Sequence, residues 1–244
     1  MSNQEGEIIR KIEPRKHVRL SEPRIPLLEK DEYIQIRVKG TEILKMTMDK
    51  SEYDKKVQKG IEGYKPLIPF LGGSIEDAPK YFPVLNHDLT MAKNRDLYIS
   101  LVTLKNHMLA VSSLPERDRE ILVLRIAWLC YSKYEWDSHA LRAKAGGFLS
   151  DDEINRIMEG SDAEGWDPFD AALLCAANEL YTDTFITDET WNALAERYNT
   201  HQLMDLVFTV GFYNMYAMAL NSFGVQLEEG LKPLINTLNI PKMK

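Results

Sequence analysis

The sequence predicts an all-α protein whose helices pack as a bundle. Several segments beyond residue 79 open at a helix-capping residue or a proline, and some close at glycine. The connections between these segments are short. Two of the segments, those after Pro115 and after Thr200, are apolar enough to occupy the centre of a bundle.

Residues 1–75 are predicted to form a less regular N-terminal extension that packs on or wraps the core, and residues 76–244 the helical domain. The extension is polar and carries scattered prolines. Its stretch YIQIRVKG alternates in a way that favours a short strand. A group of basic residues between Arg10 and Arg19 is more typical of a solvated arm than of a binding site.

The first helical segments are PKYFPVLNHDLTMA and NRDLYISLVTLKNHMLAV, which carry apolar residues at helical spacing. Pro115 suits the first position of a helix, and the acidic residues after it favour a helix N-terminus. The apolar run that follows predicts one long helix from there to the break at Gly146 and Gly147.

The remaining helices begin and end at recognisable signals. The last one, HQLMDLVFTVGFYNMYAMALNSFG, is apolar nearly all round and should end at Gly224 in a left-handed conformation. Three earlier starts carry capping signals: the capping-box spacing of Ser150 and Glu153, Asp167 before Pro168, and Thr187.

Composition and charge narrow the class of protein. The chain has 244 residues, 44% of them hydrophobic, so one domain can bury a large core. Its formal net charge of −7 disfavours a large nucleic-acid surface. The start lacks the apolar segment of a signal peptide, and no later run approaches the length of a membrane span. We therefore expect a cytoplasmic protein without a nucleic-acid or membrane partner.

The stretch YSKYEWDSH, residues 131–139, follows the apolar run ILVLRIAWLC and places a carboxylate and an imidazole on a buried helix. Projected at about 100° per residue, Glu135 and His139 fall at about 60° and 100° from Glu120. Tyr131 falls at about 20°. Glu135 and His139 are also four residues apart, so their side chains are predicted to meet directly.

Burial would give this pairing its chemical meaning. Desolvation raises the pKa of a carboxylic acid and lowers that of histidine, whereas their mutual attraction acts in the opposite direction. Two carboxylates and an imidazole in one place can hold one proton ready to donate and one base ready to accept it. That combination suits general acid–base catalysis near neutral pH.

Two other interpretations of the same residues stay open. The first is a buried Glu–His hydrogen bond that only joins two helices. The second is a carboxylate-rich metal site, although the second Glu-x-x-His pair of di-iron bundles is missing from this chain. We expect no metal and no organic cofactor. The remaining histidines of the helical part are interpreted as capping or surface groups: His87, His107 and His201.

These segments resemble the carboxymuconolactone decarboxylase family, which also contains the alkylhydroperoxidase-D-like proteins. The matching text is LPERDREILVLRIAWLCYSKYEWDSHALRAKAGGFLSDDEI, then GWDPFDAALLCAANELYTDTFITDETWNALAERY, then HQLMDLVFTVGFYNMYAMALNSFGV. The resemblance implies an all-helical bundle that assembles into homo-oligomers, trimers or hexamers, with the active site near the subunit contacts.

The peroxidase branch of that family uses a glutamate, a Cys-x-x-Cys pair and a histidine. Glu120 and His139 match the outer members, but Ser132 and Glu135 stand where the two cysteines would be. Peroxidase chemistry of this kind needs one thiolate to attack and a second thiol to resolve. Cys130 stands two residues too early and has no nearby partner. The sequence therefore disfavours a thiol-dependent peroxidase.

The decarboxylase branch, a cofactor-independent acid–base site, is the better match. The resemblance implies that His139 transfers a proton to or from a substrate carbon, that Glu135 orients it and sets its tautomer, and that Glu120 completes the relay. The substrate would be a small carboxylated lactone or related conjugated acid. The alternatives are a peroxide-handling protein and a non-catalytic oligomeric ligand-binding protein.

Several side chains are candidates to bind that substrate. Arg142 is the preferred clamp for a carboxylate, although Arg117 and Arg125 are also possible and each could equally pair on the surface. The full predicted substrate-binding set is Tyr131, Ser132, Tyr134, Trp136, Arg142, Tyr213 and Asn214.

Overall fold

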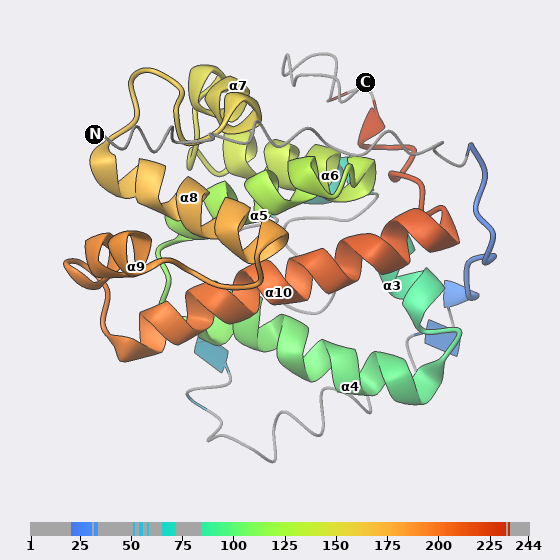
Figure 1. Ribbon diagram of the computed structural model, residues 1–244. Coiled ribbons are helices and arrows are strands. Elements are labelled where there is room, and N and C mark those ends of the chain that lie inside the picture. The colour runs from blue at the N-terminus through green and yellow to red at the C-terminus, as the bar shows by residue number, and fades with distance from the viewer. Residues whose placement is uncertain are drawn as a thin grey trace, which may run out of the picture.

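A computed structural model describes residues 21–30, 32–33, 51, 54–55, 58, 65–71, 84–232 and 234. All regular elements in these residues are helical and none is a strand, which confirms the all-α prediction (Figure 1). The strand predicted for YIQIRVKG lies outside the described residues, except for Tyr33.

The elements follow one another with short connections. They are the 3-10 helix η1 (Lys65–Leu71), α3 (Asn86–Met91), α4 (Arg95–Asn106), the π turn η3 (His107–Val111), α5 (Glu116–Leu129), α6 (Lys133–Ala145), α7 (Asp151–Glu159), α8 (Pro168–Thr182), α9 (Asp188–Ala195) and α10 (Thr200–Phe223).

Helix α5 lies at the centre of the bundle. It packs against α6, α7, α8 and α10, and α10 crosses the face shown in Figure 1. Every residue of α5 from Asp118 to Ala127 is buried. Because a helix buried on all sides keeps its polar side chains from water, the charged residues of α5 must find partners inside the protein.

Most of the predicted helix boundaries are confirmed. The capping box of Ser150 and Glu153 is formed in both directions at the start of α7. The other confirmed signals are the caps of Asp167 on α8 and Thr187 on α9, and the left-handed Gly224 after α10, with φ 69°. Pro115 differs slightly, because it is the N-cap of α5 and Glu116 is the first helical residue.

The prediction of one continuous helix up to Gly146 is wrong. Helix α5 ends at Leu129 and α6 begins at Lys133. Tyr131 has a φ of 55°. The Tyr131 amide donates to the Trp128 carbonyl at 3.0 Å, and the Ser132 amide donates to the Ala127 carbonyl at 2.8 Å. These two bonds form a Schellman ending with tyrosine at the left-handed position that glycine usually occupies.

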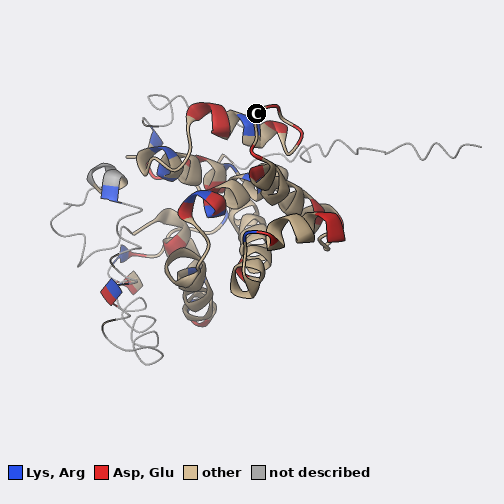
Figure 2. Ribbon diagram, turned by 90° about the vertical axis from the view of Figure 1, so that its left-hand side faces the viewer, with Lys and Arg blue, Asp and Glu red and all other residues tan. Residues whose placement is uncertain are grey.

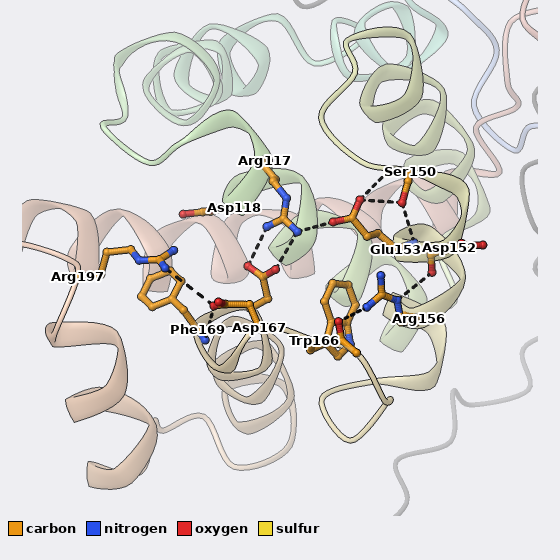
Figure 3. Close-up of polar contacts among 12 residues, drawn as sticks. Arg117, Asp118, Ser150, Asp152, Glu153, Arg156, Trp166, Asp167, Phe169 and Arg197 are labelled. Atoms are coloured by element: carbon orange, nitrogen blue, oxygen red, sulfur yellow. Dashed lines mark hydrogen bonds and ion pairs between the residues drawn. The ribbon is translucent and has the colours of Figure 1, made fainter.

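The start of α5 is fastened to α7 and α8 by Arg117 (Figure 3). Its guanidinium donates two hydrogen bonds of 2.8 Å to Asp170 and one of 2.5 Å to Glu153. Arg125 is likewise engaged, by the Asn178 side chain at 2.7 Å and the Ile157 carbonyl at 2.9 Å. The guanidinium groups of these two arginines therefore join helices of the bundle.

The described residues of the N-terminal extension contact the helical part. The Arg24 amide donates to the Phe223 carbonyl at 2.8 Å, and the Leu28 amide donates to the Leu89 carbonyl at 3.2 Å. The hydroxyl of Tyr33, which is buried, lies 2.7 Å from that of Tyr98. The division into an extension of residues 1–75, packing on or wrapping the core, and a helical domain of residues 76–244 stays a prediction.

Charge and hydropathy give two further results. Acidic and basic residues of the described part of the chain are interspersed along the ribbon in Figure 2. Within the described part of the chain, α10 is the one helix long and apolar enough to cross a membrane, and half of its most apolar window is buried inside the protein. The prediction that no segment reaches this length is therefore wrong, although a core helix passes the same test.

Candidate functional site

The turn between α5 and α6 brings Glu120 and His139 together. Because α6 folds back along α5, the two residues meet across the helix pair although 19 positions separate them in the chain. His139 Nδ1 lies 2.8 Å from Glu120 Oε2. Glu120 is completely buried and His139 is 7% exposed. The predicted grouping of Glu120 and His139 is therefore present, but it is formed by two helices.

Two arginines surround the same carboxylate. Arg142 donates to Glu120 Oε1, and the guanidinium of Arg119 lies 3.8 Å from that oxygen. Glu116 accepts from both arginines, at 2.5 Å from Arg119 and 2.8 Å from Arg142. The cluster thus contains two acidic and two basic side chains, with the imidazole of His139 at one end. This is how α5 satisfies the charges that it buries.

This surrounding charge sets the protonation of the pair. Burial alone would raise the pKa of Glu120, but the charges of Arg142 and His139 and the hydrogen bond from His139 lower it from 4.5 to about 2. An ionised carboxylate accepts hydrogen bonds and donates none. The proton between the two groups is therefore on His139 Nδ1, and in the neutral imidazole the lone pair is on Nε2.

We expect Glu120→Gln to lower the free energy of unfolding by about 3–5 kcal/mol at neutral pH, because it removes the buried negative charge that faces Arg142 and His139. Glu153→Gln is the matched control. Arg117, which pairs with the Glu153 carboxylate, is partly exposed, and a glutamine at position 153 keeps the capping box. The Glu153→Gln change should therefore lower the free energy of unfolding by less than about 1 kcal/mol. Urea unfolding of both variants measures the difference.

The same residue predicts a pH dependence. Because the pKa of Glu120 is lowered by folding, its stabilising contribution is present above pH 4.5 and is lost as the pH falls toward 2. Over that interval the wild type should lose about 3 kcal/mol through this group. The loss should be absent from Glu120→Gln, and identical pH curves for the two proteins would contradict the assignment.

Glu135 is a different kind of carboxyl group. It is 2% exposed, and neither of its oxygens has a hydrogen-bond partner. Burial raises the pKa of Glu135 well above its usual value, and the nearby Ser132 hydroxyl opposes this shift. An unpaired carboxylate is too costly to bury ionised. Glu135 is therefore a neutral carboxylic acid at neutral pH.

The predicted direct pair of Glu135 and His139 is wrong. His139 Nδ1 faces Glu120 instead, and the Glu135 oxygens make no hydrogen bond. Spacing of four residues on a helix allows a contact but does not require one. The carboxylate of α5, which two arginines keep ionised, is the stronger acceptor. The residue that orients His139 and sets its tautomer is accordingly Glu120.

Aromatic side chains of α10 form the next layer of the site. The ring of Tyr213 meets that of His139 edge to face, with centroids 5.1 Å apart. One turn along, the Tyr216 hydroxyl lies 2.6 Å from Nδ1 of His87, a residue of α3. Burial lowers the pKa of His87 to about 3, with Asp88 opposing and the charge of Lys105 adding to the shift.

His87 corrects a prediction, since it is 5% exposed and is neither a cap nor a surface group. A further histidine therefore lies close to the site, and the charge of His139 acts on its pKa. Its segment NHD begins α3, a helix of six residues, which is too short for a periodic pattern to reveal burial. The buried position could not be read from the neighbouring sequence.

The other predicted substrate-binding residues lie on several sides of this centre. The Tyr134 hydroxyl donates to Glu228 at 2.8 Å, and Trp136 packs on Trp128 with centroids 5.6 Å apart. Asn214 accepts a hydrogen bond from Cys130 Sγ at 3.1 Å. Ser132 is the N-cap of α6, and Tyr131 is half-buried in the turn before it. Substrate binding by any of them stays a prediction.

The two cysteines are free and are not thiolates at neutral pH. Burial raises the pKa of Cys130 to about 12. Burial also raises the pKa of Cys175. Thiolate nucleophiles in proteins have lowered pKa values, so neither residue has that character. Among the described residues no group of three His, Cys, Asp or Glu is placed to hold a metal ion.

Comparisons with known proteins agree with this architecture. Residues 95–178 match the Carboxymuconolactone decarboxylase family. A protein of unknown function from Agrobacterium tumefaciens, whose structure is named after the antioxidant defence protein AhpD, has a TM-score of 0.52 and 18% identity, over 56% of this chain and 94% of its own. An alkylhydroperoxidase AhpD core protein from Ralstonia eutropha JMP134 has a TM-score of 0.56 and 17% identity, over 64% and 84%.

A third similar structure covers more of the chain. The debrominase Bmp8 has a TM-score of 0.59 and 13% identity, over 88% of this chain and 97% of its own. A cysteine-to-alanine variant of Bmp8 is known in complex with 2,3,4-tribromopyrrole. Identities this low show a shared fold and carry no conclusion about activity. No curated protein matches the sequence.

Proposed function

We propose that this chain, whose helical core belongs to the carboxymuconolactone decarboxylase family, is a cofactor-independent lyase acting on a small carboxylated lactone or related conjugated acid. One observation carries the proposal. An ionised Glu120, hydrogen-bonded to His139, and a neutral Glu135 lie within the same buried helix pair. Carboxyl groups with opposed pKa shifts are the usual mark of an acid–base site.

In the proposed reaction the bond between the substrate carbon and its carboxylate breaks and carbon dioxide leaves. The electron pair moves into the adjacent conjugated carbonyl, which becomes an enolate. Glu135, as a neutral acid, then gives its proton to the carbon. One proton is consumed for each carbon dioxide released.

Glu135 must regain its proton after each turnover. Its ionised form is strongly disfavoured by burial, so it is a good acceptor at that moment. His139 is one helical turn away and is 7% exposed, and its Nδ1 lies 2.8 Å from Glu120 Oε2. We assign His139 the transfer of the proton from solvent to Glu135, and Glu120 the orientation of His139.

Arg142 has a changed role in this proposal. Its two terminal nitrogens hold Glu120 and Glu116, so it keeps Glu120 ionised. The ring of Tyr213 contacts His139, Ser132 acts on the pKa of Glu135, and the buried Ser132 hydroxyl has no hydrogen-bond partner. We assign these two residues to the substrate.

A thiol peroxidase is the runner-up and is not favoured. The similar structures include alkylhydroperoxidase-like proteins, but Ser132 and Glu135 occupy the two positions of the cysteine pair. We expect the double variant Cys130→Ala, Cys175→Ala to turn over substrate at close to the wild-type rate, because neither thiol takes part in the proposed reaction. Steady-state kinetics of both proteins measures this, and a collapse of turnover would favour thiol chemistry.

The direct test is a panel of carboxylated lactones and enol-lactones incubated with the purified full chain, with carbon dioxide release recorded. The proposal expects at least one compound to be decarboxylated, and the His139→Asn variant to decarboxylate the same compound at least about 100-fold more slowly. Saturable binding of these compounds without turnover would favour the non-catalytic ligand-binding alternative. We also propose that the protein works in the cytoplasm as a homo-oligomer.

A further inference from the structure

Helix α10 presents an apolar face to solvent that is unusual for a single chain. Between residues 202 and 220 every exposed position of α10 belongs to one stripe with spacings of four, three, four and three residues. A stripe of this spacing is the seam by which two helices pack in a coiled coil. The stripe consists of Met204 (54% exposed), Phe208 (57%), Gly211, Met215 (45%) and Met218 (62%).

The order of side chains along the stripe is nearly symmetric about its middle. Met204 lies seven residues before Gly211 and Met218 seven after it, while Phe208 lies three before and Met215 four after. Suppose that a second α10 lay antiparallel across the first, with a two-fold axis at Gly211. Met204 of each copy would then face Met218 of the other copy. Phe208 would face Met215, a favourable contact between an aromatic ring and sulfur.

Gly211 allows the two helices to approach closely at the centre. A side-chain carbon added there would have no neighbour within 4 Å inside the protein. Glycine therefore serves no packing need within the chain, and it costs helix stability relative to alanine. At a crossing point between two helices, the lack of a side chain removes the steric barrier to close contact.

Charge also favours a second copy over a membrane. Helix α10 contains no lysine or arginine, and its one acidic residue, Asp205, is held by His107 at 2.8 Å and the Ser113 amide at 3.1 Å. A helix that lies on a lipid surface normally carries Lys and Arg beside its apolar face. An antiparallel pair of α10 helices brings no like charges together.

We propose that α10 pairs with the α10 of a second copy of this chain, antiparallel and with the two-fold axis at Gly211. The pair makes a dimer, or the two-fold contact of a hexamer, and it cannot by itself close a trimer. The opposite side of the same helix carries Tyr213 and Tyr216, which contact His139 and His87. The dimer contact would therefore lie directly behind one wall of the candidate site. This inference does not depend on the proposed reaction.

Cysteine cross-linking in the full chain tests the symmetry, in a background with Cys130→Ala and Cys175→Ala. Under a two-fold axis at Gly211, Gly211→Cys should cross-link to itself under mild oxidation. Met204→Cys alone should stay monomeric on a non-reducing gel, as should Met218→Cys alone, while an equal mixture of the two should cross-link. Self-cross-linking of Met204→Cys as efficient as that of Gly211→Cys would indicate a parallel pair and overturn the proposal.

Sedimentation of the wild-type full chain over a range of concentrations tests the association itself. Phe208→Glu should weaken self-association by at least about 100-fold, because the charge enters the centre of the contact twice in each dimer. Phe208→Leu, which keeps an apolar side chain there, should leave it nearly unchanged. A wild-type protein that stays monomeric at high concentration, or that binds lipid vesicles through this stripe as a monomer, would overturn the proposal.

Discussion

Replacing His139 by asparagine should lower kcat by roughly 10²–10⁴-fold while leaving the protein folded. Asparagine is the informative choice, because its amide nitrogen can take the place of Nδ1 and keep the hydrogen bond to Glu120. What the variant loses is Nε2, the atom that would carry the proton. Steady-state kinetics gives the loss of turnover, and thermal unfolding should give a melting temperature close to that of the wild type.

The control for this experiment is His201→Asn, which changes an exposed histidine at the start of α10. It should alter neither kcat nor stability. A His139→Asn protein with full turnover would contradict the assigned role of the imidazole. If the variant instead unfolds, the imidazole ring is needed for folding, and the interpretation of the pair as a purely structural contact gains support.

Glu135→Gln should have the second large effect and should separate chemistry from stability. Glutamine has nearly the shape of a neutral glutamic acid but has no proton to give, so kcat should fall by roughly 10²–10⁴-fold. Stability should not fall. Folding raises the pKa of Glu135 above 4.5, so the stability that this group contributes is present below pH 4.5 and is lost as the pH rises.

The measurable consequence is a stability difference that depends on pH. Relative to the wild type, Glu135→Gln should gain free energy of unfolding as the pH is raised from 4.5 toward 8, and the two proteins should converge in acid. Glu164→Gln, at an exposed position, should show no such trend. An equal or lower stability of Glu135→Gln at pH 8 would mean that Glu135 is ionised and partnered in the folded protein.

The helix boundaries that could be predicted are those specified by local side-chain chemistry. The side chains of Ser150 and Glu153 each accept a hydrogen bond from the other residue's backbone amide, without help from the rest of the fold. Gly224 adopts a left-handed conformation that glycine takes without strain. The end of α5 could not be predicted in this way, because tyrosine occupies the left-handed position and no glycine or proline marks the turn.

Only part of the site could be predicted, because its contacts depend on the tertiary structure rather than on neighbouring residues. Glu120 and His139 could be chosen from the sequence, but which carboxylate contacts the imidazole depends on how α6 folds back along α5. Arg142 and Glu116, which keep Glu120 ionised, join the group through that same turn. His87 reaches the site from α3 through Tyr216, 129 positions away, a contact that only the tertiary structure creates.

The proton transfer itself can be followed by running the reaction in D₂O with a carboxylated lactone that the protein decarboxylates. The account predicts one solvent deuterium for every carbon dioxide released, delivered to a single face of the substrate carbon, by the wild type and by the double cysteine variant. Deuterium on both faces of that carbon would contradict it, because the enolate would then have been protonated by free solvent rather than by an acid fixed in the protein.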